Sequence, residues 1–299
     1  MPTLEPPYTL IRDALRESRV IPFLGAGASL GARDQIAARA DAFTALPSAS
    51  ELAQYLADKT EFPAGEPLDL AKVAEYYDVV GGRDPLHREL HKIFNRDFPI
   101  TPLHTFLADV AASTPLLIVT TNYDDLIERA LAAKNCAYDC VIYTTNPTIG
   151  ERVLWWQPGA AEPEQINPNK LDLHLEKNSI VYKMHGTVDR RDAERDQYVI
   201  TEDDYVDFLV RMTKNKAIPA IFAEAFQTRH FLFLGYGLRD WNLRVVLNRI
   251  EKDLRRPKNI KSWAIQKDPS PLEKRFWQNR GVEVYDLTIQ DFVAQLAYR

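Results

Sequence analysis

Cysteine is scarce in this chain of 299 residues, which contains Cys136 and Cys140 alone. Two cysteines cannot form a disulfide framework, and a structural zinc site would need two further ligands. His87 and His91 have helical spacing, but a solvated helix face explains that spacing better than a metal site does. We therefore expect both cysteines, four residues apart at a helix end, to be structural, and we expect no metal.

Long hydrophobic runs and an excess of positive charge are also lacking. No apolar stretch approaches the roughly 18 residues of a membrane helix, and the start MPTLEPPYTLIRD lacks the cationic and apolar regions of a signal peptide. The 37 Lys and Arg face 42 Asp and Glu, which gives a net charge of −5 and argues against a basic face for nucleic acid. We expect a cytoplasmic protein that binds neither membranes nor nucleic acid directly.

What the sequence does contain is a regular alternation of short β-branched runs with longer amphipathic segments. This pattern is typical of a parallel sheet covered by helices. The expected strands are Val20–Leu24, Leu116–Thr120, Val141–Tyr143, Ile180–Lys183, His230–Leu234, Trp263–Gln266 and Val282–Tyr285. The expected helices are Asp124–Lys134, Asp240–Leu254, Pro271–Arg280 and Thr288–Arg299. The sequence thus predicts an α/β fold with a Rossmann-like parallel sheet.

Two segments interrupt the alternation. Residues 48–110 have helical apolar spacing, which predicts a helical subdomain inserted between the first two strands of one domain that spans residues 1–299. Thr144–Asn178 contains several prolines and no clear period, so we expect a long loop, and long loops are often functional. The last expected helix reaches the chain end without a stop signal, so we expect the natural protein to continue.

The strongest candidate for chemistry is the first strand, which runs directly into Gly25-Ala26-Gly27-Ala28-Ser29. Glycine lets backbone N–H groups approach a pyrophosphate, and a following helix start adds favourable partial charge. The dinucleotide pattern G-x-G-x-x-G is not met, because the third residue after Gly27 is Leu30. A tight strand-to-helix turn without a ligand is the structural alternative.

The residues Gly27-Ala28-Ser29-Leu30-Gly31 also match the G-x-S-x-G elbow of serine hydrolases. An elbow serine normally follows several strands and needs an oxyanion loop from an earlier one. Here the motif follows the first expected strand, so a serine hydrolase is a minor alternative.

Two later strands also end in polar side chains. Leu116–Thr120 leads into Thr121-Asn122-Tyr123-Asp124, and Ile180–Lys183 leads into Met184-His185-Gly186. Open α/β sheets bind ligands at this carboxyl edge, although Asn and Asp also cap helices and a lone histidine is more often structural. Because three strand ends deliver Ser29, Asn122 and His185 to one rim, we favour a site.

The strand His230–Leu234 leads into a second glycine turn, Gly235-Tyr236-Gly237. Its glycines would either let the backbone approach an adenosine or simply end the strand. The sequence favours neither reading.

In this order the four motifs resemble the sirtuin superfamily, specifically the bacterial sirtuin-like NAD-hydrolysing domains of antiviral defence proteins. The departures concern the deacylase branch. Gly31-Ala32-Arg33-Asp34 stands where Gly-Ile-Pro-Asp is expected, no Val-Pro-Gly segment is evident, and no cysteine follows Cys140 to form the four-cysteine zinc module. The resemblance therefore implies that the NAD+ site is retained without the peptide site, and that water is the acceptor.

The resemblance also implies a role for each matching residue. Asn122 would contact the nicotinamide ribose or the attacking water, Asp124 would orient that region, and His185 would be the general base. The residues expected to bind NAD+ are Gly25, Ala26, Gly27, Ser29, Thr121, Gly235 and Tyr236, the first four around the pyrophosphate.

The implied activity is hydrolysis of NAD+ to nicotinamide and ADP-ribose in antiphage defence. An NAD+ or ADP-ribose sensor and an NAD-dependent deacylase are the alternatives. Because uncontrolled NAD+ loss would be toxic, we expect a homo-oligomer, a regulatory partner protein or a fused sensor domain.

Overall fold

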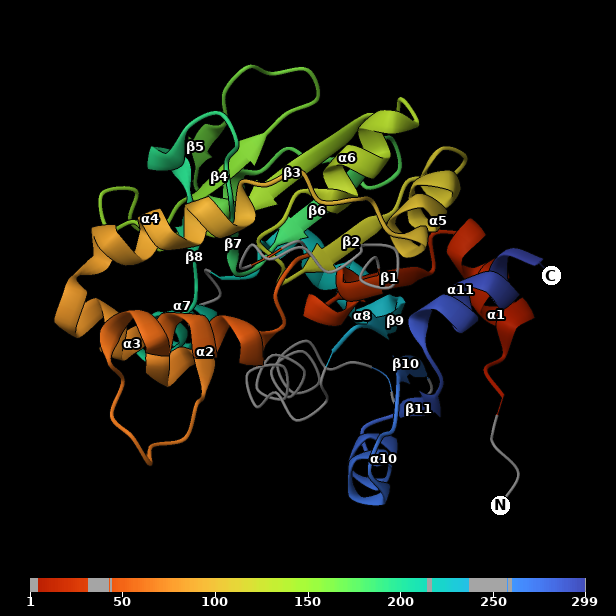
Figure 1. Ribbon diagram of the computed structural model, residues 1–299. Coiled ribbons are helices and arrows are strands. Elements are labelled where there is room, and N and C mark those ends of the chain that lie inside the picture. Colours follow the sequence, from red (N-terminus) through yellow and green to blue (C-terminus); the bar gives the residue numbers. More distant parts are fainter. Residues whose placement is uncertain are drawn as a thin grey trace.

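The sheet at the centre of the molecule contains nine strands of the described chain (Figure 1). The computed structural model describes residues 5–31, 43, 45–213, 217–236, 257 and 260–298. The strands of the sheet are β1 (Val20–Leu24), β2 (Leu117–Thr120), β3 (Tyr138–Ile142), β4 (Val153–Trp156), β5 (Glu164–Ile166), β6 (Ser179–Lys183), β9 (His230–Leu234), β10 (Ser262–Gln266) and β11 (Val282–Asp286). Their order is β11-β10-β9-β1-β2-β6-β3-β4-β5, and every pairing from β11 to β3 is parallel. The predicted Rossmann-like parallel sheet is therefore confirmed.

Helices cover both faces of the sheet, as expected for strands that are apolar throughout. One face packs against the apolar residues of α1, α5, α6 and α11, and the other packs against α7, α8 and α10. Their bounds are α1 (Tyr8–Arg16), α5 (Pro102–Ala111), α6 (Leu126–Ala133), α7 (Glu202–Thr213), α8 (Ala223–Thr228), α10 (Pro271–Gln278) and α11 (Ile289–Tyr298). The expected helix Asp240–Leu254 lies outside the described residues.

Three helices between β1 and β2 form a core of their own. They are α2 (Ala49–Thr60), α3 (Leu70–Gly81) and α4 (Arg83–Phe94), and they lie together at one side of Figure 1. Their buried residues pack on one another and on Leu126, Tyr198 and Ile200, whereas the fourth helix of this segment, α5, packs on the sheet. The α2–α4 group thus meets the main body beside the carboxyl ends of β2 and β6.

The segment Thr144–Asn178 is not the long loop that the sequence predicts. It contains β4 and β5, which extend the sheet beyond β3 in antiparallel pairing. Trp155 is buried and donates from its indole nitrogen to Asp139 at 2.9 Å, whereas Trp156 faces the other way and bonds to Ala160. The tryptophan pair is therefore a strand signal.

Smaller differences also separate prediction and structure. Cys136 follows the end of α6, whereas Cys140 lies inside β3, so the two cysteines do not share a helix end; both are free. A short antiparallel pair, β7 (Gly186–Thr187) with β8 (Gln197–Tyr198), follows β6 and was not expected from the sequence.

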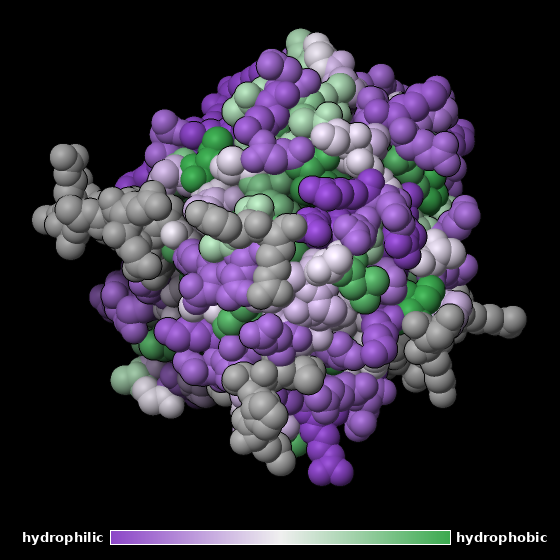
Figure 2. Space-filling model, turned by 90° about the vertical axis from the view of Figure 1, so that its right-hand side faces the viewer, coloured by the Kyte–Doolittle hydropathy of each residue, from purple (hydrophilic) through white to green (hydrophobic). Residues whose placement is uncertain are grey.

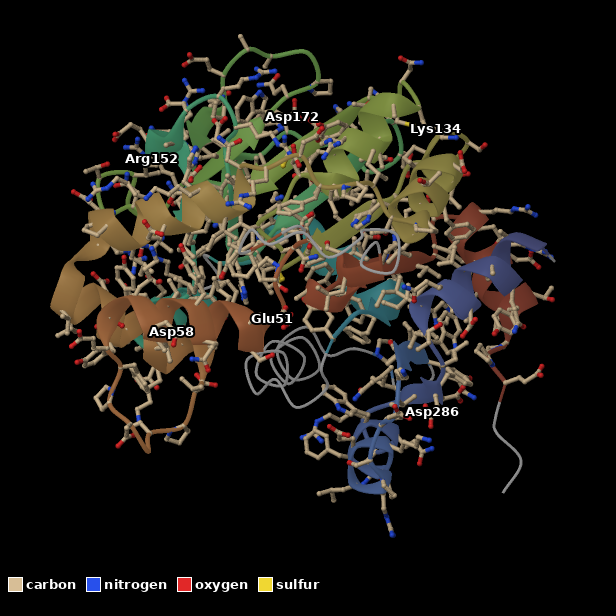
Figure 3. All side chains as sticks on the ribbon, in the orientation of Figure 1. Glu51, Asp58, Lys134, Arg152, Asp172 and Asp286 are labelled. Carbon is tan, nitrogen blue, oxygen red and sulfur yellow. The ribbon has the colours of Figure 1, made fainter. Side chains whose placement is uncertain are left out.

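The coloured part of the face in Figure 2 is mostly hydrophilic. Figure 2 shows polar residues over most of one face, with apolar residues in scattered groups. Charged side chains such as Asp58, Lys134 and Asp286 project outward from the ribbon (Figure 3). None of the described helices is long and apolar enough to cross a membrane.

Candidate active site

The turns after β1 and β9 are in direct contact. After β1 the chain forms a short 3-10 helix, η1 (Ala26–Ala28), and the Gly27 N–H donates to the carbonyl of Gly235 at 2.9 Å. Gly235 has φ of +77°, and a Cβ there would lie 2.0 Å from the Ala28 nitrogen, so only glycine fits. Each glycine turn therefore allows the other to pack closely against it. The two turns meet beside β1, where the strand order reverses.

This packing changes the expected role of the backbone N–H groups. The N–H groups of Gly25, Gly27, Ala28 and Ser29 donate to Leu234, Gly235, Gly25 and Ala26, respectively. A pyrophosphate cradle that uses the N–H groups of Gly25, Gly27 and Ser29 is therefore not present in this arrangement. The glycines provide close approach between two loops instead.

Three polar side chains from β1 and β2 form a hydrogen-bond network. The Ser29 hydroxyl donates to Asp124 Oδ2 at 2.9 Å, and the Asn122 amide donates to Ser29 Oγ and to the Gly25 carbonyl, both at 3.1 Å. Ser29 and Asp124 are buried. The network fixes the ends of β1 and β2 against each other and orients all three side chains.

Asp124 serves the helix and the network at once. Its Oδ1 accepts from the Leu126 N–H at 3.1 Å, at the start of α6, while Oδ2 holds Ser29. The sequence left helix capping and site function as alternatives, and one carboxylate makes both sets of contacts.

Lys183, at the end of β6, holds the turn that contains Asp124 by hydrogen bonds. It is fully buried and donates to the backbone carbonyl of Asp124 at 2.5 Å and to Glu128 Oε1 at 2.7 Å. Burial opposes the charge of the ammonium group, but the Glu128 carboxylate raises the pKa of Lys183 above its ordinary value. The Asp124 carbonyl is thus fixed by a charged, buried donor.

His185 lies two residues beyond the end of β6, after Met184. Its ring packs edge-on against Tyr205 and Phe208 of α7, and it is 6% exposed. Burial lowers the pKa of His185 to about 3, so the imidazole is neutral at physiological pH. Gly186 follows with φ of +91°, and a Cβ there would lie 2.0 Å from the Gln197 carbonyl, which explains the His-Gly sequence.

The Ser29–Asn122–Asp124 network and His185 line one cavity of about 460 Å³ at the carboxyl edge of the sheet. Eight of the ten residues expected from the sequence line it: Ala26, Ser29, Thr121, Asn122, Asp124, His185, Gly235 and Tyr236. Gly25 and Gly27 lie behind this surface, against Gly235. The hydroxyls of Thr121 and Tyr236 are 2.8 Å apart and join the β2 and β9 turns. Gly237, the last residue of the second glycine turn, lies outside the described residues.

The opposite wall of the cavity was not expected from the sequence. It comes from the start of α2, the start of α3 at Asp69–Ala71, Phe94 of α4, and Tyr205 of α7. Asp69 caps α3, with its side chain accepting from the N–H groups of Ala71 and Lys72. A cap at Asp69 before an apolar helix can be recognised in the sequence. Its position across the cavity cannot, because that position depends on tertiary packing.

A buried threonine and histidine also support the site without lining it. Thr101 and His104, at the start of α5, are joined at 2.7 Å, and the Thr101 hydroxyl reaches the Ala28 carbonyl at 3.4 Å. The Thr-x-x-His spacing was visible in the sequence, but nothing there showed that it packs under η1.

The serine hydrolase reading loses support. Within the described residues, Ser29 Oγ bonds to a carboxylate and an amide, and no histidine forms a hydrogen bond with it. Nor does any group of three His, Cys, Asp or Glu in the described ranges have a metal-binding arrangement.

The sheet order defines a Rossmann-like α/β domain, and its pocket lies where the strand order reverses. Residues 116–285 match the family model of the SIR2-like domain, and the chain belongs to that family. The Gly25–Ser29 turn precedes the matched segment.

The chain is also similar to curated proteins that are longer than it is. The chain is 26% identical to the defense-associated sirtuin 2 of Bacillus subtilis over 72% of this chain and 18% of that protein. It is 26% identical to NAD(+) hydrolase ThsA of Bacillus cereus (strain MSX-D12) over 89% and 47%, and 28% identical to ThsA of Enterococcus faecium over 81% and 42%. The chain thus spans less than half the length of these relatives.

A solved structure described under the mechanism and regulation of Sir2 enzymes aligns with a TM-score of 0.45 and 12% identity, over 97% of this chain and 96% of that one.

Proposed function

We propose that this chain is the NAD+-cleaving domain of a bacterial antiviral defence protein, which releases nicotinamide from NAD+ to leave ADP-ribose. The convergence of Ser29, Asn122, Asp124 and His185 on one cavity from three strand ends carries the proposal. Family membership and the names of the relatives, NAD(+) hydrolase and defense-associated sirtuin, support it.

NAD+ would bind along the carboxyl edge of the sheet. Ala26, Gly235 and Tyr236 would contact the pyrophosphate and adenosine, and Thr121 would position Tyr236. The nicotinamide ribose would lie near Asn122 and His185. Residues 48–110 would then belong to the same domain as a wall of its pocket, since α2, α3 and α4 contribute to that cavity.

In the reaction the bond between ribose C1′ and the nicotinamide nitrogen breaks, and its electron pair goes to the nicotinamide ring. Positive charge develops on the ribose, and a water oxygen bonds to C1′ while its proton passes to a base. The Asn122 amide is committed to Ser29 and Gly25, so its Oδ1 would face the ribose or the water. Neutral His185 would accept a proton from the water or a ribose hydroxyl.

Chromatography of NAD+ after incubation with the purified chain tests this proposal. Nicotinamide and ADP-ribose should appear without added peptide. Release only with an acyl-lysine peptide would make the protein a deacylase, and binding without release would make it a sensor. Because the relatives are longer, we propose that assembly or a further domain controls the activity. The chain is therefore assayed over a wide range of protein concentrations, so that activation by self-association would be seen.

A further inference from the structure

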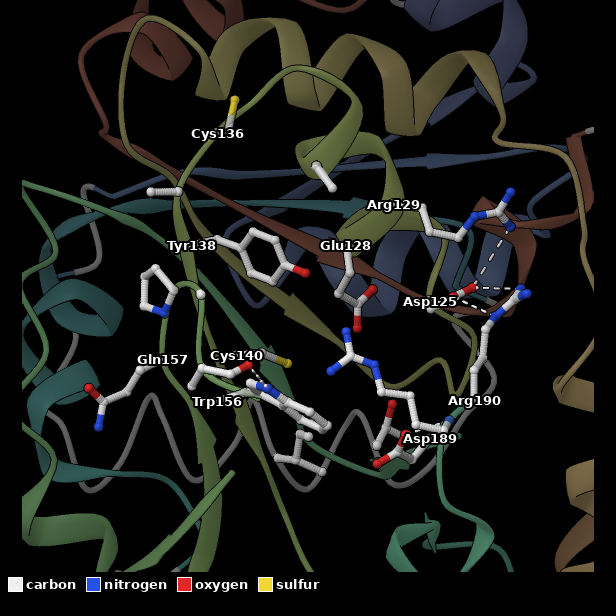
Figure 4. A pocket seen from close by; sticks show the side chains of 18 of the residues that line it. Asp125, Glu128, Arg129, Cys136, Tyr138, Cys140, Trp156, Gln157, Asp189 and Arg190 are labelled. Atoms are coloured by element: carbon white, nitrogen blue, oxygen red, sulfur yellow. Dashed lines mark hydrogen bonds and ion pairs between the residues drawn. The ribbon is translucent and has the colours of Figure 1, made fainter. Parts of the chain in front are cut away.

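A second cavity, of about 550 Å³, lies on the other side of the turn that carries Asp124. Asp124 lines the first cavity and the next residue, Asp125, lines the second. The second cavity is bounded by α6, by β3, by the turn after β4 at residues 156–160, and by residues 187–191. Figure 4 shows the side chains that point into it.

Glu128 of α6 lines this cavity and holds a buried carboxylate at its edge. Its Oε1 bonds to Lys183 at 2.7 Å, while Oε2 is buried and has no hydrogen-bond partner in the described part of the chain. A buried carboxylate oxygen without a donor is costly. The Tyr138 hydroxyl faces Glu128 in Figure 4 and lies within electrostatic reach of both Glu128 and Arg191. This end of the cavity therefore suits an N–H donor.

The arginines of the cavity differ in how far their charge is used. Arg190 pairs with Asp125 at 2.6 Å, and Arg129 pairs with Asp97 at 2.7 Å. The exposed Arg191 forms no ion pair with a described residue; it donates to the Ala161 carbonyl at 3.3 Å. Arg191 is thus the cation available to an anionic ligand.

The same guanidinium lies over a flat aromatic surface. The Arg191 guanidinium carbon is 5.8 Å from the centre of the Trp156 ring, and the Trp156 indole nitrogen is occupied by the Ala160 carbonyl. Trp156 therefore offers its ring face rather than its N–H, and a planar group can stack there beside a positive charge.

We propose that this cavity is a second ligand site, for a nucleotide whose base carries an exocyclic amino group. A small rotation of the Glu128 carboxylate exposes Oε2 to the amine, which donates to it. The base stacks on Trp156, and the phosphate pairs with Arg191. This site is separate from the proposed NAD+ site and does not depend on NAD+ cleavage.

Calorimetric titration of the purified chain with AMP tests the proposal. AMP should bind, IMP, which has a carbonyl in place of the amine, should bind about tenfold more weakly, and adenosine should also lose about tenfold because it lacks the phosphate. Arg191→Ala should weaken AMP about tenfold and leave adenosine unchanged. Arg88→Ala, which removes an exposed arginine outside the cavity, is the matched control and should bind AMP normally.

A second measurement separates this site from the first cavity. Trp156→Phe should remove AMP-induced quenching of tryptophan fluorescence while the far-ultraviolet spectrum stays unchanged. Ala26→Phe, which places a large side chain in the first cavity, should bind AMP normally. The proposal is overturned if millimolar AMP gives no heat, if IMP equals AMP, or if Ala26→Phe loses AMP while Arg191→Ala has no effect. The last result would place AMP in the first cavity.

Discussion

At the scale of single residues, the proposed mechanism depends most on His185. Its ring is enclosed by Tyr205 and Phe208 on one side and lines the cavity on the other. The neighbouring Gly186, not His185, meets the steric demand of the β7–β8 pair. The local fold thus requires glycine at position 186, whereas the His185 side chain contributes to the wall of the cavity.

We expect His185→Ala to lower the rate of NAD+ cleavage about 10² to 10⁴-fold, the usual effect of losing a general base. Nicotinamide release measured on protein with an unchanged circular dichroism spectrum checks this. His174→Ala, at an exposed histidine outside the cavity, should retain full activity. Wild-type rates in both variants would remove His185 from the mechanism.

The pH dependence of cleavage should also show the environment of His185. Burial lowers its pKa to about 3, so the neutral form persists as the pH falls through 6.5, where an ordinary histidine takes up its proton. We expect kcat/KM at pH 6 and pH 8 to agree within about twofold. A loss centred near pH 6.5 that is absent in the residual activity of His185→Gln would contradict this assignment.

At the scale of elements, the contact between η1 and the turn after β9 leaves no room for a side chain at Gly235. Gly235→Ala would place a Cβ against the Ala28 nitrogen in a left-handed backbone conformation, and should cost about 2 to 4 kcal/mol of unfolding free energy. Gly65 is the matched control, because it has φ of +90° with open space around it, so Gly65→Ala should cost only about 1 kcal/mol.

Urea denaturation of both glycine variants measures the difference. If Gly235→Ala is no less stable than Gly65→Ala, the two turns are not held together as described. The same measurement separates lost packing from lost chemistry, because it needs no substrate.

The strands that position the site were predictable, since β1, β2, β6 and β9 are buried on both faces and read as continuous apolar runs. Their parallel pairing then brings every strand-end motif to one edge. The strand β4 and the edge strand β5 were missed because they are short and β5 is mostly exposed. The α2–α4 wall of the cavity could not be placed, because its position depends on packing against Tyr198 and Leu126 rather than on its own sequence.

At the scale of the whole molecule, two buried histidines and the half-buried His87 make the fold sensitive to acid. Burial lowers the pKa of His87 and His104 to about 4 and that of His185 to about 3. The unfolded chain takes up a proton at each near pH 6.5, whereas the folded chain does not until the pH is far lower. The contribution of these three histidines to the unfolding free energy is therefore fully present above pH 6.5 and is lost as the pH falls below that value.

Each of these histidines should cost roughly 2 kcal/mol of unfolding free energy at pH 5 relative to pH 7. Urea denaturation at both pH values checks this. His104→Gln should narrow the difference between the two pH values by about that amount, whereas the exposed-site variant His174→Gln should leave it unchanged. Equal narrowing in both variants would show that burial is not the cause.

The position of β1 between β2 and β9 also has a consequence for synthesis of the chain. The turn at Gly25–Ser29 leaves the ribosome early, but its partner at Gly235–Tyr236 follows about 210 residues later. At translation rates of about 5 to 20 residues per second, roughly 10 to 40 seconds separate the two. Throughout that interval the nascent chain lacks β9 and the residues after it that line the first cavity. A chain interrupted before residue 230 therefore lacks Gly235 and Tyr236 and cannot complete the proposed NAD+ site.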